Sequence, residues 1–190
     1  QIPLKENSYG YIDPLNVRSC YAESKKLGET MCISWMHQYG VPIKIVRIFH
    51  TYGPGMKLDD GRVFADFVSD VVNGRDIVMR SDGIAIRAFC YLSDAIIAFF
   101  TVILKGEIGQ AYNIGNDEAE ISIIDLANLL VSLYPEKKMK VIKQDESTTP
   151  GYLKSPFSRQ VPDIKKIKQL GWIPQINLNE GFRRTIECFL

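Results

Sequence analysis

Apolar residues recur at helical spacing in some segments and form short unbroken runs in others, so helices and strands are expected to alternate along the chain. Between Val63 and Val72 the apolar positions lie three and four residues apart, which is the spacing of one helix face. Ile43 to Phe49 is rich in β-branched residues, as is typical of a buried strand. The same reasoning predicts further helices at about 20–37, 93–104, 122–133, 163–170 and 178–189, and further strands at about 77–79, 87–92, 111–114 and 139–142. This interleaving favours the α/β class.

Turn-forming residues set the boundaries of these elements. Ser19 and the pair Ser93-Asp94 are predicted to cap the helices that follow them. His50 to Gly55 follows a predicted strand directly, at the kind of strand end where open α/β sheets bind ligands. Residues 1–17 and 145–162 are predicted to be loops.

Composition and charge exclude several classes of protein. Lys plus Arg number 23 and Asp plus Glu 22, so nothing suggests bulk attraction to nucleic acid or to an anionic membrane. Hydrophobic residues make up 46%, as in ordinary globular proteins, and no apolar run has the length of a membrane span. The longest, Ala95 to Leu104, is predicted to form a buried helix.

Cysteine and histidine usage indicates no metal site. The four cysteines lie far apart without Cys-x-x-Cys spacing, and we expect reduced, mostly buried thiols in a cytoplasmic protein. With only two histidines, a histidine-rich metal site is excluded.

Tyr21 and Lys25 are the strongest candidates for chemistry. Residues four apart share one helix face, so both side chains can point into one site. A phenol needs a nearby positive charge before it can act as a base near neutral pH. The alternative is an exposed aromatic residue beside an ordinary surface lysine.

Six motifs in order resemble the nucleotide-sugar epimerase/dehydratase branch of the extended short-chain dehydrogenases/reductases. They are Tyr21-x-x-x-Lys25, Arg47 to Pro54, Asp60-Gly61-Arg62-Val63, Gly83-x-x-x-Arg87 to Asp94, Tyr112-Asn113-Ile114-Gly115, and Arg159 to Ile164 ahead of Leu170-Gly171-Trp172. Within the branch, the Tyr21 segment, the Arg62 motif and Arg87-Ala88-Phe89-x-Tyr91 look most like UDP-glucuronate decarboxylases.

The resemblance implies a fold of which this chain holds only part. The expected architecture is the C-terminal part of a Rossmann-type doubly wound sheet with a smaller α/β substrate-binding subdomain. Residues 1–60 would be the remnant of the Rossmann-type domain, and residues 61–190 would mainly form the substrate subdomain. No Gly-x-Gly-x-x-Gly turn follows a strand, so the N-terminal dinucleotide-binding half is expected to lie outside this chain.

The resemblance also implies a mechanism with NAD as cofactor. Tyr21 would take the proton from the sugar 4-hydroxyl while hydride passes from C4 to NAD+. Lys25 would lower the pKa of Tyr21 and hydrogen-bond the nicotinamide ribose. A 4-keto sugar then loses carbon dioxide, eliminates water or epimerises, depending on the substituent at C5.

Further positions match family contacts to a nucleotide-diphosphate sugar. Arg87 would hold a carboxylate or phosphate oxygens, Arg62 and Arg159 lie near the diphosphate, and Asn113 contacts the sugar nucleotide. Each of these four could instead be structural. The family usually has asparagine where this chain has His50, which puts sugar specificity in doubt, and Thr51 would contact the nicotinamide side.

Three functions follow as expectations. The first is a UDP-glucuronate decarboxylase-like enzyme. The second is a dTDP-glucose 4,6-dehydratase-like enzyme or a UDP- or CDP-hexose 4-epimerase. The third is a non-catalytic nucleotide-sugar binding module, which this chain alone could be. The long helix of Tyr21, with Met31, Ile33 and Trp35 partly outward, also fits the family's homodimer, although packing within one chain explains that stripe equally well.

Overall fold

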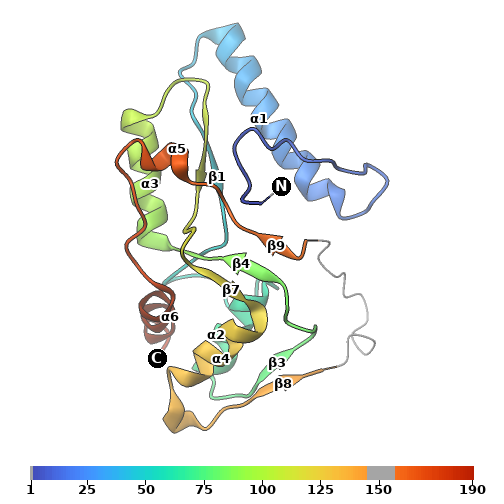
Figure 1. Ribbon diagram of the computed structural model, residues 1–190, viewed down its shortest axis with the longest axis vertical. Coiled ribbons are helices and arrows are strands. Elements are labelled where there is room, and N and C mark those ends of the chain that lie inside the picture. The colour runs from blue at the N-terminus through green and yellow to red at the C-terminus, as the bar shows by residue number, and fades with distance from the viewer. Residues whose placement is uncertain (1, 145–156) are drawn as a thin grey trace.

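The computed structural model describes residues 2–144 and 157–190, and in these the predicted alternation of helices and strands is present (Figure 1). The helices are α1 Ser19–Tyr39, α2 Val63–Val72, α3 Leu92–Lys105, α4 Ile123–Ser132, α5 Lys165–Lys168 and α6 Leu178–Glu187, with a 3-10 turn at Pro135–Lys137. The strands are β1 Ile45–Ile48, β2 Thr51–Tyr52, β3 Ile77–Met79, β4 Ile86–Ala88, β5 Cys90–Tyr91, β6 Ala111–Ile114, β7 Glu120–Ser122, β8 Val141–Lys143 and β9 Arg159–Gln160.

Most strands pair in parallel, as expected when helices connect them. The parallel pairs are β1 with β6, β2 with β5 and β3 with β8. In the fourth sheet β4 lies between β7, which is antiparallel to it, and β9, which is parallel to it. The α/β class is therefore confirmed, in the form of short ladders within the described residues.

Two hydrophobic clusters hold these elements together. The larger one joins α2, α4 and α6 around aromatic residues, among which Tyr52 and Phe182 stack with ring centroids 4.0 Å apart. The smaller one packs α3 and α5 against β6 around Tyr112 and Trp172. Figure 1 shows α3 and α5 beside the β1–β6 pair, with α2 and α4 at the other end of the molecule. The division at residue 60 stays a prediction.

Helix α1 lies to one side of the molecule and has no buried residue (Figure 1). It ends at Gly40, which adopts a left-handed conformation and donates its N–H to the Met36 carbonyl. Arg47 of β1 holds the helix through two 2.7 Å hydrogen bonds to the Glu29 carboxylate. A bidentate ion pair therefore connects α1 to the sheet.

Both predicted helix caps are wrong. Ser19 is the first helical residue, and its hydroxyl donates to the Asp13 carbonyl, while Arg18 occupies the cap position. α3 begins at Leu92, so Asp94 lies inside its first turn. The Asp94 carboxylate instead accepts the N–H groups of Gln175 and Ile176, each at 2.9 Å. The Asp94 carboxylate therefore binds backbone groups about 80 residues away instead of capping its own helix.

Two predictions about burial and one about a strand are also wrong. Of the cysteines only Cys90 is buried, whereas Cys20 and Cys188 lie exposed on helix α1 and at the end of α6. α3 buries one face only, and its outer face exposes Ile96, Ile97, Phe100, Ile103 and Leu104. The strand predicted at 87–92 is two strands, because the chain changes pairing partner at Phe89. Of the loop predicted at 145–162, residues 145–156 lie outside the described part, and β9 occupies Arg159–Gln160.

In the described residues no helix combines the length and the apolar character needed to cross a membrane. Those residues also contain no cluster of histidine, cysteine and acidic side chains that could hold a metal ion.

Candidate active site

Tyr21 and Lys25 lie on one face of α1, as their spacing predicts. The Lys25 ammonium nitrogen is 5.4 Å from the centroid of the Tyr21 ring. Tyr21 is 70% exposed, so its phenol is open to a partner that approaches α1 from outside. The arrangement places the ammonium group over the face of the Tyr21 ring, as in a cation–π contact.

His50 follows β1 and packs against the large cluster, with its ring centroid 5.6 Å from that of Phe89. Its Nδ1 atom is buried and has no hydrogen-bond partner among the described residues. Burial, and then the positive charges of Arg87 and Arg62, lower the pKa of His50 to about 4. The imidazole is therefore neutral at physiological pH and has an unused polar atom.

Arg87 is a buried cation on β4, with 8% of its surface exposed. Its guanidinium donates to the carbonyls of Ile86 at 2.8 Å and Phe157 at 3.1 Å. Since Arg87 and Arg62 both act on His50, these three predicted substrate residues share one electrostatic neighbourhood.

Arg62 immediately precedes α2 and is paired with Asp60. Its Nε donates to the Asp60 carboxylate at 2.6 Å, and this bond lowers the pKa of Asp60. The guanidinium carbon also lies 4.7 Å from the centre of the Phe64 ring. Half of the Arg62 side chain is still exposed, so it can contact a ligand as well.

Arg159 and Asn113 are both engaged in contacts within the chain. Arg159 binds the Glu120 carboxylate at 2.7 to 3.0 Å, and its strand β9 lies beside β4. Asn113, 1% exposed, donates its amide hydrogens to the carbonyls of Leu4 at 2.9 Å and Asp163 at 3.1 Å. Its amide therefore joins two distant segments of the chain.

Thr51 opens β2 and pairs with Cys90 of β5. Its hydroxyl donates to the Phe49 carbonyl at 3.2 Å. Thr51 therefore lies directly next to His50 at the carboxyl end of β1, the kind of sheet edge at which ligands bind.

Sequence reasoning missed the polar network that positions α1. Besides Glu29, Arg47 binds the Glu6 carbonyl at 2.7 Å, and the Glu6 carboxylate accepts the N–H of Asn113 at 3.0 Å. These partners are separated by up to 107 residues, so a local pattern could not show them. The one signal in the sequence was Arg47 itself, because a charged residue inside a predicted buried strand needs a polar partner.

With this geometry established, comparison with known proteins defines the class. Residues 2–115 match the model of the NAD dependent epimerase/dehydratase family, and the chain belongs to that family. It is 36% identical over 189 residues to UDP-glucuronic acid decarboxylase 6 of Arabidopsis thaliana. This alignment covers 98% of this chain and 52% of that relative. It is 34% identical to UDP-glucuronic acid decarboxylase 1 of Danio rerio, with 98% of this chain and 43% of that protein covered.

Solved structures agree on the fold. An epimerase from Methanothermobacter thermautotrophicus superposes with a TM-score of 0.83 at 24% identity, over 100% of this chain and 54% of that one. DesIV, a dTDP-glucose 4,6-dehydratase from Streptomyces venezuelae solved with NAD and TYD bound, gives 0.77 at 25% identity, over 97% and 57%. The chain spans about half the length of the relatives that it matches.

Proposed function

We propose that this chain is the substrate-binding part of an NAD-dependent nucleotide-sugar enzyme that oxidises the sugar at C4 and then decarboxylates it, as UDP-glucuronate decarboxylases do. The observation that carries the proposal is the Tyr21–Lys25 pair on one exposed face of α1. Similarity to UDP-glucuronic acid decarboxylases over 98% of the chain supports this choice of reaction.

In this proposal Tyr21 is the base and Lys25 supplies the positive charge beside it. The phenolate of Tyr21 takes the proton from the sugar 4-hydroxyl, and the Lys25 ammonium stabilises the phenolate electrostatically. Bound NAD would accept hydride from C4 and return it later in the cycle. Tyr21, Lys25 and Thr51 are the residues of this chain that would face its nicotinamide side.

The residues present fit one end of that cofactor. Tyr21 and Lys25 are exposed on α1 and so are accessible to a nicotinamide ribose. A glycine-rich turn for the pyrophosphate is absent from the 190 residues, and we propose that a dinucleotide-binding half supplies it.

Two surfaces support docking of such a half. Within the described residues β1 pairs with β6 on one side, and Ile48 of β1 is 53% exposed although parallel strands are usually covered. The neighbouring helix α3 exposes an apolar face that includes Ile97, Phe100 and Leu104. A strand added parallel to β1, with its helix against α3, would cover both surfaces.

Positive charge near the carboxyl end of β1 supports an anionic substrate. Arg87 and Arg62 act on His50 from two different elements, and their guanidinium forks suit phosphate or carboxylate oxygens. Arg159, on the strand beside Arg87, would add a third cation near the diphosphate. Any contact from Asn113 would use its side-chain oxygen, because both amide hydrogens are already donated.

The outward side chains of α1 support a homodimer of the complete enzyme. Met31 and Trp35 are each about half exposed, and the Trp35 ring packs edge-on against Tyr39 at 5.6 Å. A second copy of the helix would cover this apolar stripe.

The test is an assay of a polypeptide that comprises this chain and its dinucleotide-binding half. Given UDP-glucuronate and NAD+, it should release carbon dioxide, and Tyr21→Phe should reduce turnover at least a hundredfold because the base is removed. Tyr39→Phe, at the far end of the same helix, is the matched control and should keep activity. Undiminished turnover in Tyr21→Phe would refute the role of Tyr21 as base.

The product mass separates the other reactions of this family. Loss of water from a dTDP-hexose would favour the dehydratase alternative, and an unchanged mass with a UDP- or CDP-hexose would favour the epimerase. His50 is the reason to retain these alternatives. It is bulkier than the asparagine that the resemblance implies at this place, and it packs against Phe89, so the sugar that fits beside it can differ.

Calorimetry of the 190-residue chain tests the non-catalytic alternative. Binding of a nucleotide sugar without binding of NAD+ would agree with a substrate-binding part that needs its other half. Micromolar binding of NAD+ to this chain alone would contradict the proposed division of the site.

A further inference from the structure

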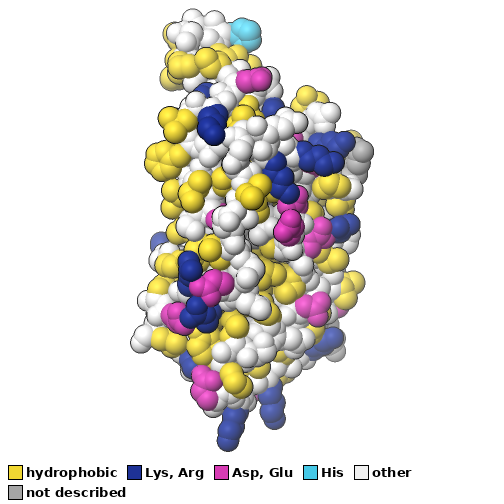
Figure 2. Space-filling view, turned by 60° about the vertical axis from the view of Figure 1, so that its left-hand side comes forward, with side chains coloured by type: hydrophobic (Ala, Val, Ile, Leu, Met, Phe, Trp, Pro, Cys, Tyr) yellow, Lys and Arg dark blue, Asp and Glu magenta, His cyan; other side chains and the backbone are white. Residues whose placement is uncertain are grey.

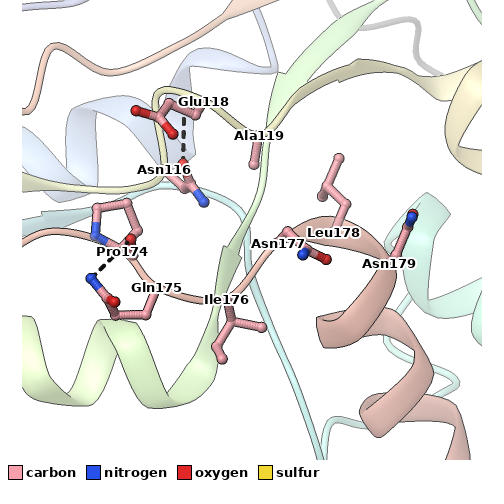
Figure 3. A pocket seen from close by; sticks show the side chains of 9 residues that line it. All are labelled: Asn116, Glu118, Ala119, Pro174, Gln175, Ile176, Asn177, Leu178 and Asn179. Atoms are coloured by element: carbon pink, nitrogen blue, oxygen red, sulfur yellow. Dashed lines mark hydrogen bonds between the residues drawn. The ribbon is translucent and has the colours of Figure 1, made fainter.

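A pocket lies between the turn after β6 and the start of α6 (Figure 3). Its volume is about 330 Å³, at the small end of ordinary ligand pockets. Asn116, Ala119 and the segment from Pro174 to Asn179 form its walls. None of the residues predicted from the sequence to act on substrate or cofactor lines it.

Asn116 aims an amide donor into this pocket. The residue is 6% exposed, and its side-chain oxygen accepts the N–H of Glu118 at 3.0 Å. Its amide nitrogen takes no part in that bond, and Figure 3 shows the nitrogen pointing into the open space. An amide nitrogen that faces open space in this way is available as a donor to an oxygen atom of a ligand.

Asn177 faces the same space from the opposite wall. Its side-chain oxygen caps α6 by accepting the N–H of Glu180 at 3.0 Å, and its exposed amide nitrogen lies on the side of that oxygen nearer Asn116 (Figure 3). The N–H groups of Leu178 and Asn179 have no helical acceptor at this end of α6. Donors from two elements therefore converge where a helix N-terminus favours negative charge.

The wall behind these donors is fixed. The buried Asp94 carboxylate holds the N–H groups of Gln175 and Ile176, each at 2.9 Å, and its carbonyl accepts from Trp172 at 3.0 Å. The segment that leads into α6 is thus held in place before any ligand arrives, which lowers the entropy cost of binding.

The charges at the pocket select among possible anions. The lining residues include no lysine or arginine, and the one ionisable side chain among them, Glu118, points away from the two amide nitrogens (Figure 3). Without a cation in the lining, a phosphate dianion would bring twice the uncompensated charge of a carboxylate. Neutral donors therefore suit the singly charged carboxylate better. Pro174, Ile176 and Leu178 add apolar surface for a small carbon skeleton.

We propose that this pocket binds the carboxylate of a small organic acid, held by the amide nitrogens of Asn116 and Asn177 and by the first N–H groups of α6. The ligand would connect the turn after β6 to the helix that packs on Tyr52. This site needs neither NAD nor a sugar nucleotide, so its test is independent of the proposed function.

Sodium acetate is the probe, added to the ¹⁵N-labelled 190-residue chain and compared with sodium chloride at equal ionic strength. The side-chain amide signals of Asn116 and Asn177 should shift and saturate with acetate but not with chloride. Inorganic phosphate should bind at least tenfold more weakly than acetate. Absence of acetate-specific shifts at these two residues, or tighter binding of phosphate, would overturn the proposal.

Two conservative variants test the donors. Asn116→Asp and Asn177→Asp each keep the oxygen that accepts a backbone N–H, and aspartate is also a good N-cap, so both variants should fold. Each replaces a donor with a negative oxygen and should weaken acetate binding at least tenfold. Asn16→Asp is the control, since the Asn16 oxygen makes the same kind of bond, to the N–H of Arg18 at 2.9 Å, outside the pocket. Unchanged affinity in both pocket variants would contradict the assignment.

Discussion

His50 illustrates how burial changes the chemistry of a single residue. At an exposed position its pKa would lie near 6.5, but burial and the positive charges of Arg87 and Arg62 lower it to about 4. The asparagine that the resemblance implies for this position would have no such titration. Compared with asparagine, His50 offers a neutral ring in place of an amide donor, and the Nδ1 atom of that ring has no hydrogen-bond partner among the described residues.

Lowering the pH should destabilise the protein through His50. The folded-state pKa of about 4 lies below the unfolded value, so the unfolded chain takes up the proton first. The free energy of unfolding should fall by about 3 kcal/mol as the pH falls from about 6.5 to about 4, and this loss stops below pH 4. Urea unfolding at a series of pH values measures it.

The variant His50→Asn isolates this contribution from that of the carboxylates. Its stability should fall less over the same pH range than that of the unmodified chain. The exposed His37, in the last turn of α1, provides the control His37→Asn, which should keep the full dependence. Equal slopes for His50→Asn and the unmodified chain would show that His50 is not buried in its neutral form.

Glycines show how closely two helices approach their neighbours. A Cβ at Gly181 of α6 would lie within 3 Å of the Tyr52 hydroxyl and ring, so Gly181→Ala should force α6 away and destabilise the fold by about 1–3 kcal/mol. A Cβ at Gly28 of α1 meets nothing within 4 Å. Gly28→Ala should therefore be neutral or stabilise by about 0.5–1 kcal/mol, since alanine favours helix. Thermal unfolding of both variants measures these opposite effects.

The attachment of α1 is the next test at the level of elements. Because α1 buries no residue, the bidentate bond from Arg47 to Glu29 should contribute much of its docking. Glu29→Gln should cost about 1–2 kcal/mol and speed amide hydrogen exchange along α1. Glu23→Gln, on the exposed side of the same helix, should leave exchange nearly unchanged. Similar exchange in both variants would mean that other contacts hold the helix.

Local sequence signals predicted those elements whose information is local. The helix Val63–Val72 and the strands Ile77–Met79 and Ala111–Ile114 have the predicted bounds, because periodicity and flanking turn residues define them. The strand expected at 87–92 failed because Phe89 bonds to the Ala119 carbonyl and Cys90 to that of His50. Such partner changes depend on residues about 30 and 40 positions away, which no local pattern reveals.

The candidate site divides in the same way. Helix spacing alone predicted that Tyr21 and Lys25 share a face, and the 5.4 Å contact agrees. The burial of Arg87, the two acceptors of Asn113 and the pairing of Arg159 with Glu120 all depend on tertiary contacts. The residue types made these positions candidates for substrate binding. The sequence could not show whether each side chain contacts a substrate or bonds to another part of the chain.

At the scale of the whole molecule, apolar surface is distributed over the outside. Figure 2 shows hydrophobic side chains spread over one face, with acidic and basic side chains interspersed among them. The exposed residues of α3 and of β1 lie on adjoining elements. Scattered apolar residues are normal on a protein surface, whereas apolar residues that gather on adjoining elements mark sites of association.

The 190-residue chain alone should therefore self-associate through α3 and the β1 edge. We expect sedimentation to show an average mass that rises with concentration, together with binding of a hydrophobic dye. The double variant Phe100→Lys with Leu104→Lys should reduce both effects, because two charges then lie on the outer face of α3, where the native residues are 60% and 77% exposed. Ile84→Lys, outside α3 and β1 and 69% exposed, is the matched control and should change neither. A monomeric unmodified chain without dye binding would show that these surfaces need no partner, and it would remove this support for a docked dinucleotide-binding half.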